Sequence, residues 1–229
     1  MSAKSAPARP MPRLYLATPV VDDAAALAAM LPEILASADV AAVLLRLPDS
    51  DPRSLLARIK AIAPEVQGTG AALLLDGHAD LVARGGADGA HLTGIEAMQD
   101  ALPGLKPERI AGCGGLVTRH DAMTAGEAGV DYVLFGEPDH HGRRPSVDAV
   151  AERLQWWAEL FEPPCVGYAA TTVEAHTFAA AGADFILVSD MIWTDHAGAA
   201  AALARVADAI REGFAATSGR PPTAQIDAA

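Results

Sequence analysis

The sequence has no long apolar run, no run of basic residues and few aromatic side chains. No stretch of about 18 uncharged apolar residues occurs in the chain, so a membrane-spanning helix is not expected. The 17 Lys and Arg are scattered among 29 Asp and Glu, which gives a formal net charge of −12. Nucleic-acid-binding proteins carry a basic patch, so that class of partner is excluded. An acidic balance is typical of soluble cytoplasmic proteins, and this is the location that we expect.

Cysteine is also scarce. Cys113 and Cys165 are the only two, and both lie in or beside apolar segments. A disulfide framework needs more cysteines, so we expect a reduced intracellular protein with thiols in its core. No histidine neighbours Cys113 in the sequence, which favours a structural role over a reactive one.

One pattern occurs three times, at residues 86–92, 128–135 and 181–188. In each copy an Ala-rich helical stretch ends at a glycine, an aspartate follows shortly after it, and a short apolar run begins. A glycine that ends a helix and an apolar run of strand length indicate a helix–strand unit. Three such units are an internal repeat, which favours a parallel sheet.

Eight short apolar segments are predicted to be strands, and Pro19 is expected to end the first. They cover residues 13–17, 41–46, 71–76, 89–92, 109–113, 131–135, 165–168 and 185–188. Helical stretches separate them at roughly 28 residues per unit, the period of a (β/α)8 barrel. No Gly-x-Gly-x-x-Gly motif follows a strand, which disfavours a doubly wound dinucleotide-binding sheet. We therefore predict an α/β protein with one TIM-barrel domain.

The barrel is expected to span residues 13–214. Residues 1–12 and 215–229 are rich in Pro, Ala and polar residues, so both ends are predicted to be disordered. The N-terminal stretch also lacks the apolar centre of a secretory signal.

Capping residues predict several helix boundaries. Asp22 or Asp23 is expected to cap the first helix, and Pro32 to kink or divide it. Thr172 is expected to cap the helix after the seventh strand, and a final helix is predicted over 195–214.

Ligands of (β/α)8 barrels bind at the carboxyl ends of the strands. This rule turns the strand assignment into a set of candidate site residues: Thr18, Arg46, Asp76, His91, Gly114, Gly115, the 137–144 loop, 169–171 and Ser189. The loops after the seventh and eighth strands often bind phosphate through backbone N–H groups.

Blocks 87–92, 129–136 and 182–189, together with Arg46 after a Leu-Leu strand, resemble the thiamine phosphate synthase and thiazole tautomerase family. The resemblance covers about residues 13–214. It implies a transferase that joins a hydroxymethylpyrimidine diphosphate to a thiazole phosphate, with Mg²⁺ helping pyrophosphate to leave.

The resemblance assigns roles at the second to fourth strands. Where the family has Gln-Leu-Arg-x-Lys this chain has 44–48, Leu-Leu-Arg-Leu-Pro, so only Arg46 is retained on the diphosphate. Where the family has Asn-Asp this chain has Asp76-Gly77, and the second metal carboxylate aligns with Glu96. Asp76 and Glu96 are therefore the implied Mg²⁺ ligands.

The later strands carry the implied substrate-binding residues. Gly115 stands where a serine is usual, and Ala169-Ala170 stand where the family has Gly-Gly. Val188-Ser189 is retained, and its N–H groups suit the thiazole phosphate. The tautomerase histidine aligns with Val117, so tautomerase activity is not implied.

The loop after the sixth strand departs most from the family, which has threonines and a lysine there. Arg143 and Arg144 replace them and are predicted to close over the diphosphate as catalytic residues, the alternative being a solvated loop. His140-His141 are a candidate transition-metal site, although adjacent histidines more often point apart.

The other candidates also have a structural alternative. Arg46 is either a phosphate-binding residue or a rim charge paired with a carboxylate. Asp76 and Glu96 either share Mg²⁺ or act as a helix cap and a solvated charge. His91 is expected to orient the mouth of the barrel through a hydrogen bond rather than to act as an acid or base.

Two functions follow. The first is a thiamine phosphate synthase-like transferase; the alternative is a catalytically impaired member of the family that binds a phosphorylated small molecule. A homo-oligomer is possible under either, because Trp156 and Trp157 cannot share one helix face and one of them is free to mark a subunit contact.

Overall fold

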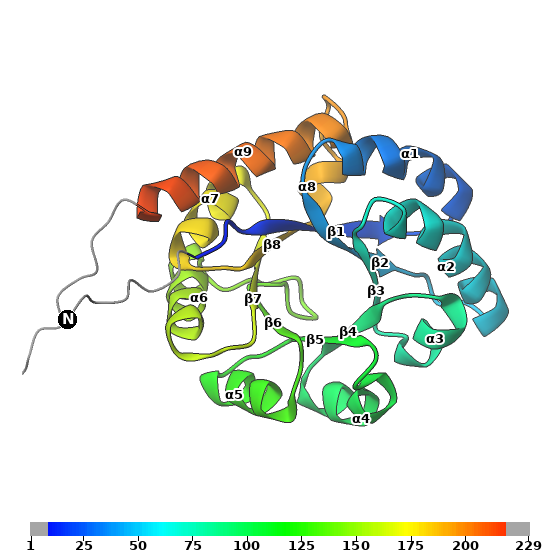
Figure 1. Cartoon of the computed structure of the whole chain (residues 1–229), viewed down its shortest axis with the longest axis horizontal. Coiled ribbons are helices and arrows are strands. Elements are labelled where there is room, and N and C mark those ends of the chain that lie inside the picture. The colour runs from blue at the N-terminus through cyan, green and yellow to red at the C-terminus, as the bar shows by residue number, and fades with distance from the viewer. Residues whose placement is uncertain (1–8, 219–229) are drawn as a thin grey trace, which may run out of the picture.

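The computed structural model describes residues 9–218, and its strands close into one parallel barrel (Figure 1). The strands are β1 (Arg13–Val20), β2 (Val40–Arg46), β3 (Ala72–Asp76), β4 (Gly89–Thr93), β5 (Ile110–Gly114), β6 (Tyr132–Phe135), β7 (Cys165–Ala169) and β8 (Phe185–Val188). Each strand pairs in parallel with the next in the chain, and β8 pairs with β1, so the sheet has no free edge. The prediction of a (β/α)8 TIM barrel is confirmed.

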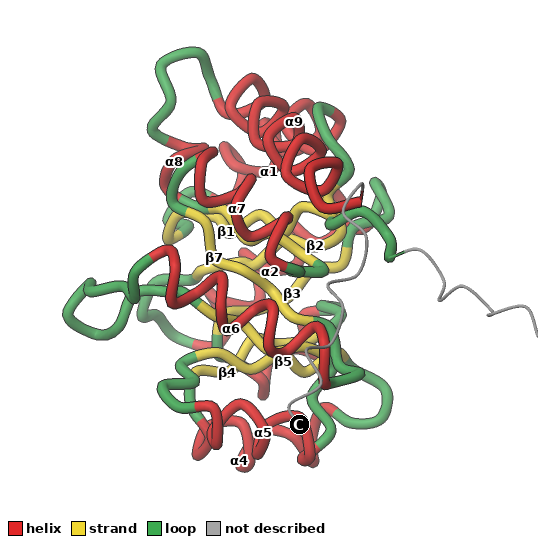
Figure 2. The backbone as a smooth tube through the Cα atoms, turned by 90° about the vertical axis from the view of Figure 1, so that its left-hand side faces the viewer, coloured by secondary structure: helices red, strands yellow, loops and turns green. Residues whose placement is uncertain are grey.

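Helices connect the strands and lie around the outside of the barrel (Figure 2). They are α1 (Ala24–Ala36), α2 (Pro52–Gln67), the 3₁₀ turn η1 (Ala79–Leu81), α3 (Val82–Gly85), α4 (Ile95–Leu105), α5 (Arg119–Ala128), α6 (Val147–Leu160), α7 (Thr172–Ala181), α8 (Asp190–Trp193) and α9 (Ala199–Ser218). No helix within residues 9–218 is long and apolar enough to span a membrane.

The threefold repeat has a structural role at the amino ends of the strands. In each copy the aspartate just before an even-numbered strand accepts an N–H from the start of the strand before it. The pairs are Asp88 with Leu73 (2.7 Å), Asp131 with Ala111 (2.7 Å) and Asp184 with Cys165 (2.8 Å). These bonds lie at the end of the barrel opposite the ligand-binding face, where barrel residues serve stability.

The inside of the barrel is filled by tyrosines and aliphatic side chains. They are Tyr15, Ala17, Leu44, Leu74, Tyr132, Leu134, Val166, Tyr168 and Leu187. Gly112 makes room for one of them, because a Cβ there would lie 1.9 Å from the Tyr132 ring. Since strand side chains alternate, the residues two positions beyond Leu44, Leu74 and Leu187 also face inward, at the carboxyl ends. They are Arg46, Asp76 and Ser189.

Pro19 does not end the first strand and Pro32 does not divide the first helix, so both of these predictions are wrong; a kink at Pro32 stays a prediction. β1 continues through Pro19 to Val20, because its pairing with β2 shifts register between Ala17 and Val20 and does not need the missing N–H. Pro32 does not divide α1, since it lies on the exposed side of the helix, where water can satisfy the carbonyl that it leaves unpaired.

Other boundaries also differ from prediction. Asp23 caps α1, but the cap of α7 is Thr171 and not Thr172, because the Thr171 hydroxyl accepts the Glu174 N–H. The predicted helix 195–214 corresponds to α9, which begins only at Ala199, after Gly198 with φ 90°; the short α8 lies before the predicted span.

The ends of the barrel lie outside the predicted span 13–214. The last helix continues to Ser218. Arg9, in the predicted disordered stretch 1–12, donates hydrogen bonds to the carbonyls of Gly182 and Ala183. The remaining residues predicted to be disordered, 1–8 and 219–229, lie outside the described residues.

Candidate active site

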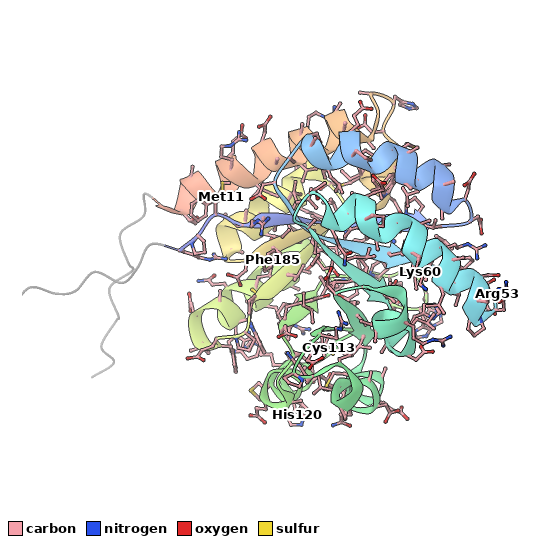
Figure 3. All side chains as sticks on the ribbon, turned by 45° about the vertical axis from the view of Figure 1, so that its right-hand side comes forward. Met11, Arg53, Lys60, Cys113, His120 and Phe185 are labelled. Carbon is pink, nitrogen blue, oxygen red and sulfur yellow. The ribbon has the colours of Figure 1, made fainter. Side chains whose placement is uncertain are left out.

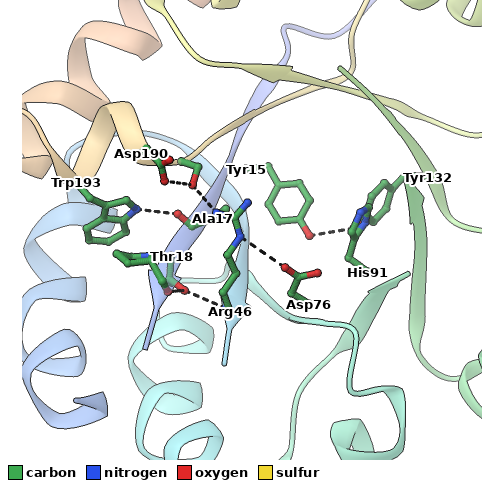
Figure 4. Close-up of polar contacts among 11 residues, drawn as sticks. Tyr15, Ala17, Thr18, Arg46, Asp76, His91, Tyr132, Asp190 and Trp193 are labelled. Atoms are coloured by element: carbon green, nitrogen blue, oxygen red, sulfur yellow. Dashed lines mark hydrogen bonds and ion pairs between the residues drawn. The ribbon is translucent and has the colours of Figure 1, made fainter. Parts of the chain in front are cut away.

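Arg46 at the end of β2 and Asp76 at the end of β3 meet at the carboxyl end of the barrel (Figure 4). Ser189, the residue after β8, joins them there. Arg46 Nη1 donates to Ser189 Oγ over 2.8 Å, and Arg46 Nε lies 3.6 Å from Asp76 Oδ2. A guanidinium at the mouth of a barrel is suited to a phosphate, because its planar fork matches phosphate oxygens. Burial raises the pKa of Asp76, and the Arg46 charge opposes that rise.

Neighbouring groups orient this cluster. The fully buried Thr18 accepts the backbone N–H of Arg46 (3.1 Å) and donates to the Pro19 carbonyl (2.8 Å). Ser189 Oγ donates to Asp190 Oδ1 over 3.1 Å, so its hydroxyl hydrogen is engaged while its oxygen accepts from Arg46. Hydrogen bonds from its backbone N–H and from its guanidinium therefore fix Arg46 at the mouth of the barrel.

His91 is held by a buried chain of hydroxyl groups. The Tyr15 and Tyr132 hydroxyls lie 2.9 Å apart, and the Tyr132 hydroxyl lies 3.0 Å from His91 Nδ1 (Figure 4). Burial, aided by the Arg46 charge, lowers the pKa of His91 to about 4. His91 is therefore neutral at neutral pH, and the hydrogen bond expected of it is present.

Glu137 lies at the mouth, and it was predicted only as part of the 137–144 loop, with no role in substrate binding. Its carboxylate, which follows β6, accepts the backbone N–H of Gly115. Burial raises its pKa to about 7, with Asp76 adding to the rise. The signal in the sequence was the pair Gly114-Gly115, of which Gly115 stands where the family carries a serine, together with a glutamate just after the sixth strand.

Arg144 and Glu174 form the other polar cluster of this face. Arg144 donates to the carbonyls of Gly136 (2.8 Å) and Tyr168 (2.7 Å), pairs with both Glu174 carboxylate oxygens (3.2 and 2.8 Å), and lies 4.9 Å from the Tyr168 ring centroid. Glu174 also accepts the backbone N–H of Ala170 over 2.9 Å. The predicted mobile residue is thus fixed in this structure between β6, β7 and α7.

Comparison with known proteins identifies the family. The family model described as thiamine monophosphate synthase matches residues 14–192. The chain belongs to this family. The thiamine-phosphate synthase of Rhodospirillum centenum is 40% identical over 200 residues, covering 84% of this chain and 94% of that protein. That of Hyphomonas neptunium is 36% identical over 219 residues, covering 90% and 97%.

The fold agrees with that assignment. The structure of thiamine phosphate pyrophosphorylase from Pyrococcus furiosus matches with a TM-score of 0.71 at 18% identity, over 88% of this chain and 96% of that one. The prediction of a thiamine phosphate synthase-like transferase of thiamine biosynthesis is confirmed by the family and by its relatives.

The other residues predicted in the loop after β6, which departs from the family, make their contacts within that loop. Arg143 has a side chain that is 74% exposed and pairs with Asp139 of its own loop, at 3.0 Å. His140 and His141 lie with ring centroids 3.9 Å apart. Among residues 9–218, no group of three or more His, Cys, Asp or Glu side chains is placed to hold a metal ion.

The two cysteines are structural. Cys113 and Cys165 are both fully buried, and burial raises the pKa of each thiol to about 12. A thiol with so high a pKa is not a nucleophile at neutral pH.

Proposed function

We propose that this protein joins a hydroxymethylpyrimidine diphosphate to a thiazole phosphate at the mouth of its barrel. In this reaction the bond between the pyrimidine methylene carbon and the diphosphate oxygen breaks, and pyrophosphate leaves with the electron pair. The thiazole nitrogen then forms the new bond to that carbon. Catalysis consists of stabilising the leaving charge, so no covalent nucleophile is needed.

The observation that carries this proposal is the cluster of Arg46, Asp76 and Ser189 in a member of the thiamine monophosphate synthase family. Arg46 would hold the diphosphate, because its guanidinium lies at the mouth, held by contacts with Asp76 of β3 and Ser189 after β8. Val188 and Ser189 would hold the thiazole phosphate, with Gly115, Ala169 and Ala170 lining the same face. His91 would orient the ring through its fixed imidazole.

The arginines after β6 would act at the rim. Arg144 contributes positive charge above Tyr168, an inward-facing residue of β7. Its charge is balanced by Glu174, so a phosphate would have to compete with that carboxylate. Arg143 would have to leave Asp139 to reach a ligand, which makes it the weaker of the two candidates.

Mg²⁺ fits the chemistry of the mouth. Mg²⁺ is bound by one or two carboxylates together with substrate phosphates and water, and Asp76 offers a partly buried carboxylate beside Arg46. Bound to the diphosphate, the ion would neutralise charge on the leaving group. Glu96 lies exposed in the first turn of α4 and is the other proposed ligand.

The test is a coupling assay with both phosphorylated precursors and Mg²⁺. We expect thiamine phosphate to form, and activity to fall strongly in Asp76→Asn and less in Glu96→Gln. Absence of product above background would contradict the proposal. Calorimetric binding of either precursor without turnover would instead support a catalytically impaired binding protein.

We also propose a cytoplasmic location and self-association. The acidic charge of −12 accords with the first proposal, and the tryptophans of α6 motivate the second. Trp157 is fully buried, whereas Trp156 is partly exposed and packs on Phe161 and Arg119 at the outer face of α6. Cell fractionation tests the first proposal, and light scattering during size-exclusion chromatography tests the second.

A further inference from the structure

Glu137 is a carboxylate without a cationic partner at the mouth of the barrel. It is half-buried, and no Lys or Arg of the described residues 9–218 forms an ion pair with it. It is held by the Gly115 N–H, from the strand-end loop of β5 next to it. Paired carboxylates are common on this surface, so an unpaired and half-buried one needs a different explanation.

The glycines before it make room for this carboxylate. A Cβ on Gly114 would lie 2.2 Å from Glu137 Oε1 and 2.7 Å from His91 Nε2. Gly114 therefore has to lack a side chain for both groups to lie where they do. Since Nδ1 of His91 is taken up by Tyr132, its Nε2 edge and the Glu137 carboxyl are left together beside the end of β5.

The charge at this position selects the part of the substrate that can lie there. A carboxylate repels a diphosphate, which instead suits Arg46 at the end of β2, where it is hydrogen-bonded to Ser189 after β8. The uncharged ring of the substrate has no such conflict. An aminopyrimidine presents a ring nitrogen, which accepts, next to an exocyclic amino group, which donates. A carboxyl group that is partly protonated near neutral pH matches this edge, because it can donate through one oxygen and accept through the other.

We propose that Glu137 recognises the amino-substituted edge of the pyrimidine ring, while Arg46 holds the diphosphate of the same molecule. This inference rests on the proposed function and names the group that selects its substrate. His91 lies beside the same edge through Nε2. Gly114 leaves the space that this carboxylate needs, and Gly115, which stands where the family carries a serine, donates the N–H that it accepts.

The first test compares Glu137→Leu, Glu137→Gln and the control Glu127→Gln, an exposed carboxylate on α5. The substrates are the pyrimidine diphosphate and an analogue in which hydrogen replaces the amino group. Loss of two hydrogen bonds predicts that Glu137→Leu raises KM for the natural diphosphate by about 30- to 100-fold. With the analogue, which keeps the ring nitrogen, only one hydrogen bond is lost, so Glu137→Leu should raise its KM by only about five- to tenfold. Use of the thiazole phosphate should not change. Glu137→Gln retains a donor and an acceptor and should restore most of the loss.

A structural role for Glu137 predicts a different pattern, in which Glu137→Leu impairs the natural substrate and the analogue equally. That result, or an unchanged KM for the natural diphosphate, would overturn the inference. Gly114→Ala is a second variant: it keeps Glu137 but displaces its carboxylate, so it should raise the same KM.

Failure of the proposed function is separable from failure of this inference. If the wild-type protein forms no product, calorimetry with the free aminopyrimidine alcohol replaces the assay. The wild type should then bind that alcohol at least tenfold more tightly than Glu137→Leu does. Equal affinity would refute the recognition by Glu137.

Discussion

Arg46 and Ser189 are separated by 143 residues in the chain and are joined by a 2.8 Å hydrogen bond across the mouth of the barrel. The bond links β2 to the residue after β8, so it forms only when the sheet closes. The candidate site is therefore a property of the closed barrel and not of any one segment.

Substitution of Arg46 should affect the diphosphate most. Arg46→Ala is expected to lower kcat/KM for the pyrimidine diphosphate by about 100-fold, since a charge-assisted, two-pronged contact is lost. Arg46→Lys keeps the charge but not the planar fork and should lose about tenfold. Lys60→Ala, on α2 outside the barrel (Figure 3), is the matched control. A change of less than threefold in Arg46→Ala would contradict the assignment.

The two adjacent arginines of the β6–α6 loop should differ in stability. Arg144→Ala is expected to lower the free energy of unfolding by about 2–4 kcal/mol, because Glu174 and two carbonyls lose their charged donor in a partly buried place. Arg143→Ala should change it little, since its ion pair with Asp139 is exposed. Urea denaturation of the pair measures the difference, and equal effects would argue against a fixed Arg144.

The hydroxyl chain predicts an order of effects for two tyrosines. Tyr132→Phe removes the group between Tyr15 and His91 and leaves both without their partner, so it should cost about 2–3 kcal/mol. Tyr15→Phe removes only an end of the chain, and Tyr132 keeps His91, so about 1 kcal/mol is expected. Thermal and urea unfolding test the order. A larger loss in Tyr15→Phe than in Tyr132→Phe would contradict the arrangement.

The raised pKa of Glu137 predicts a dependence of stability on pH. Its pKa is about 7 in the folded protein and ordinarily 4.5, so the folded state binds more protons between these values. The wild type should lose stability as the pH rises through this range, by up to about 3 kcal/mol relative to Glu137→Gln. His91 has the opposite tendency, because its pKa is lowered to about 4, but it is present in both proteins and cancels in the difference.

The measurement is urea denaturation of wild type and Glu137→Gln at several pH values from about 5 to about 8. The variant should gain on the wild type as the pH increases. A constant difference would show that the carboxyl titrates at its ordinary pKa.

Periodicity and glycine placement were sufficient to predict the barrel. The three Gly-Asp repeats mark the starts of alternate strands, and side-chain alternation then places Arg46, Asp76 and Ser189 on the inner face. The predictions at the prolines failed because proline disfavours regular structure only where its N–H is needed. Pro19 lies at a register shift between β1 and β2, and Pro32 lies on the exposed side of α1.

The candidate site was less predictable than the fold. Glu137 belongs to a loop whose sequence does not say which side chain turns inward, and its position depends on Gly114, 23 residues earlier. Arg144 was expected to move with Arg143, but the two adjacent loop residues have different partners, and Glu174 of α7 holds only Arg144. Such contacts depend on tertiary packing, and neither propensity nor spacing encodes them.

The three aspartates of the repeat secure the strands at the end of the barrel far from Arg46. The residues that stabilise the fold and the candidate site residues thus lie at opposite ends of the barrel. Replacing the family's serine by Gly115, or its lysine-bearing loop by residues 139–144, changes the ligand-binding end of the barrel without weakening the other end. A lineage carrying this architecture is free to drift towards a new ligand while its proteins remain folded.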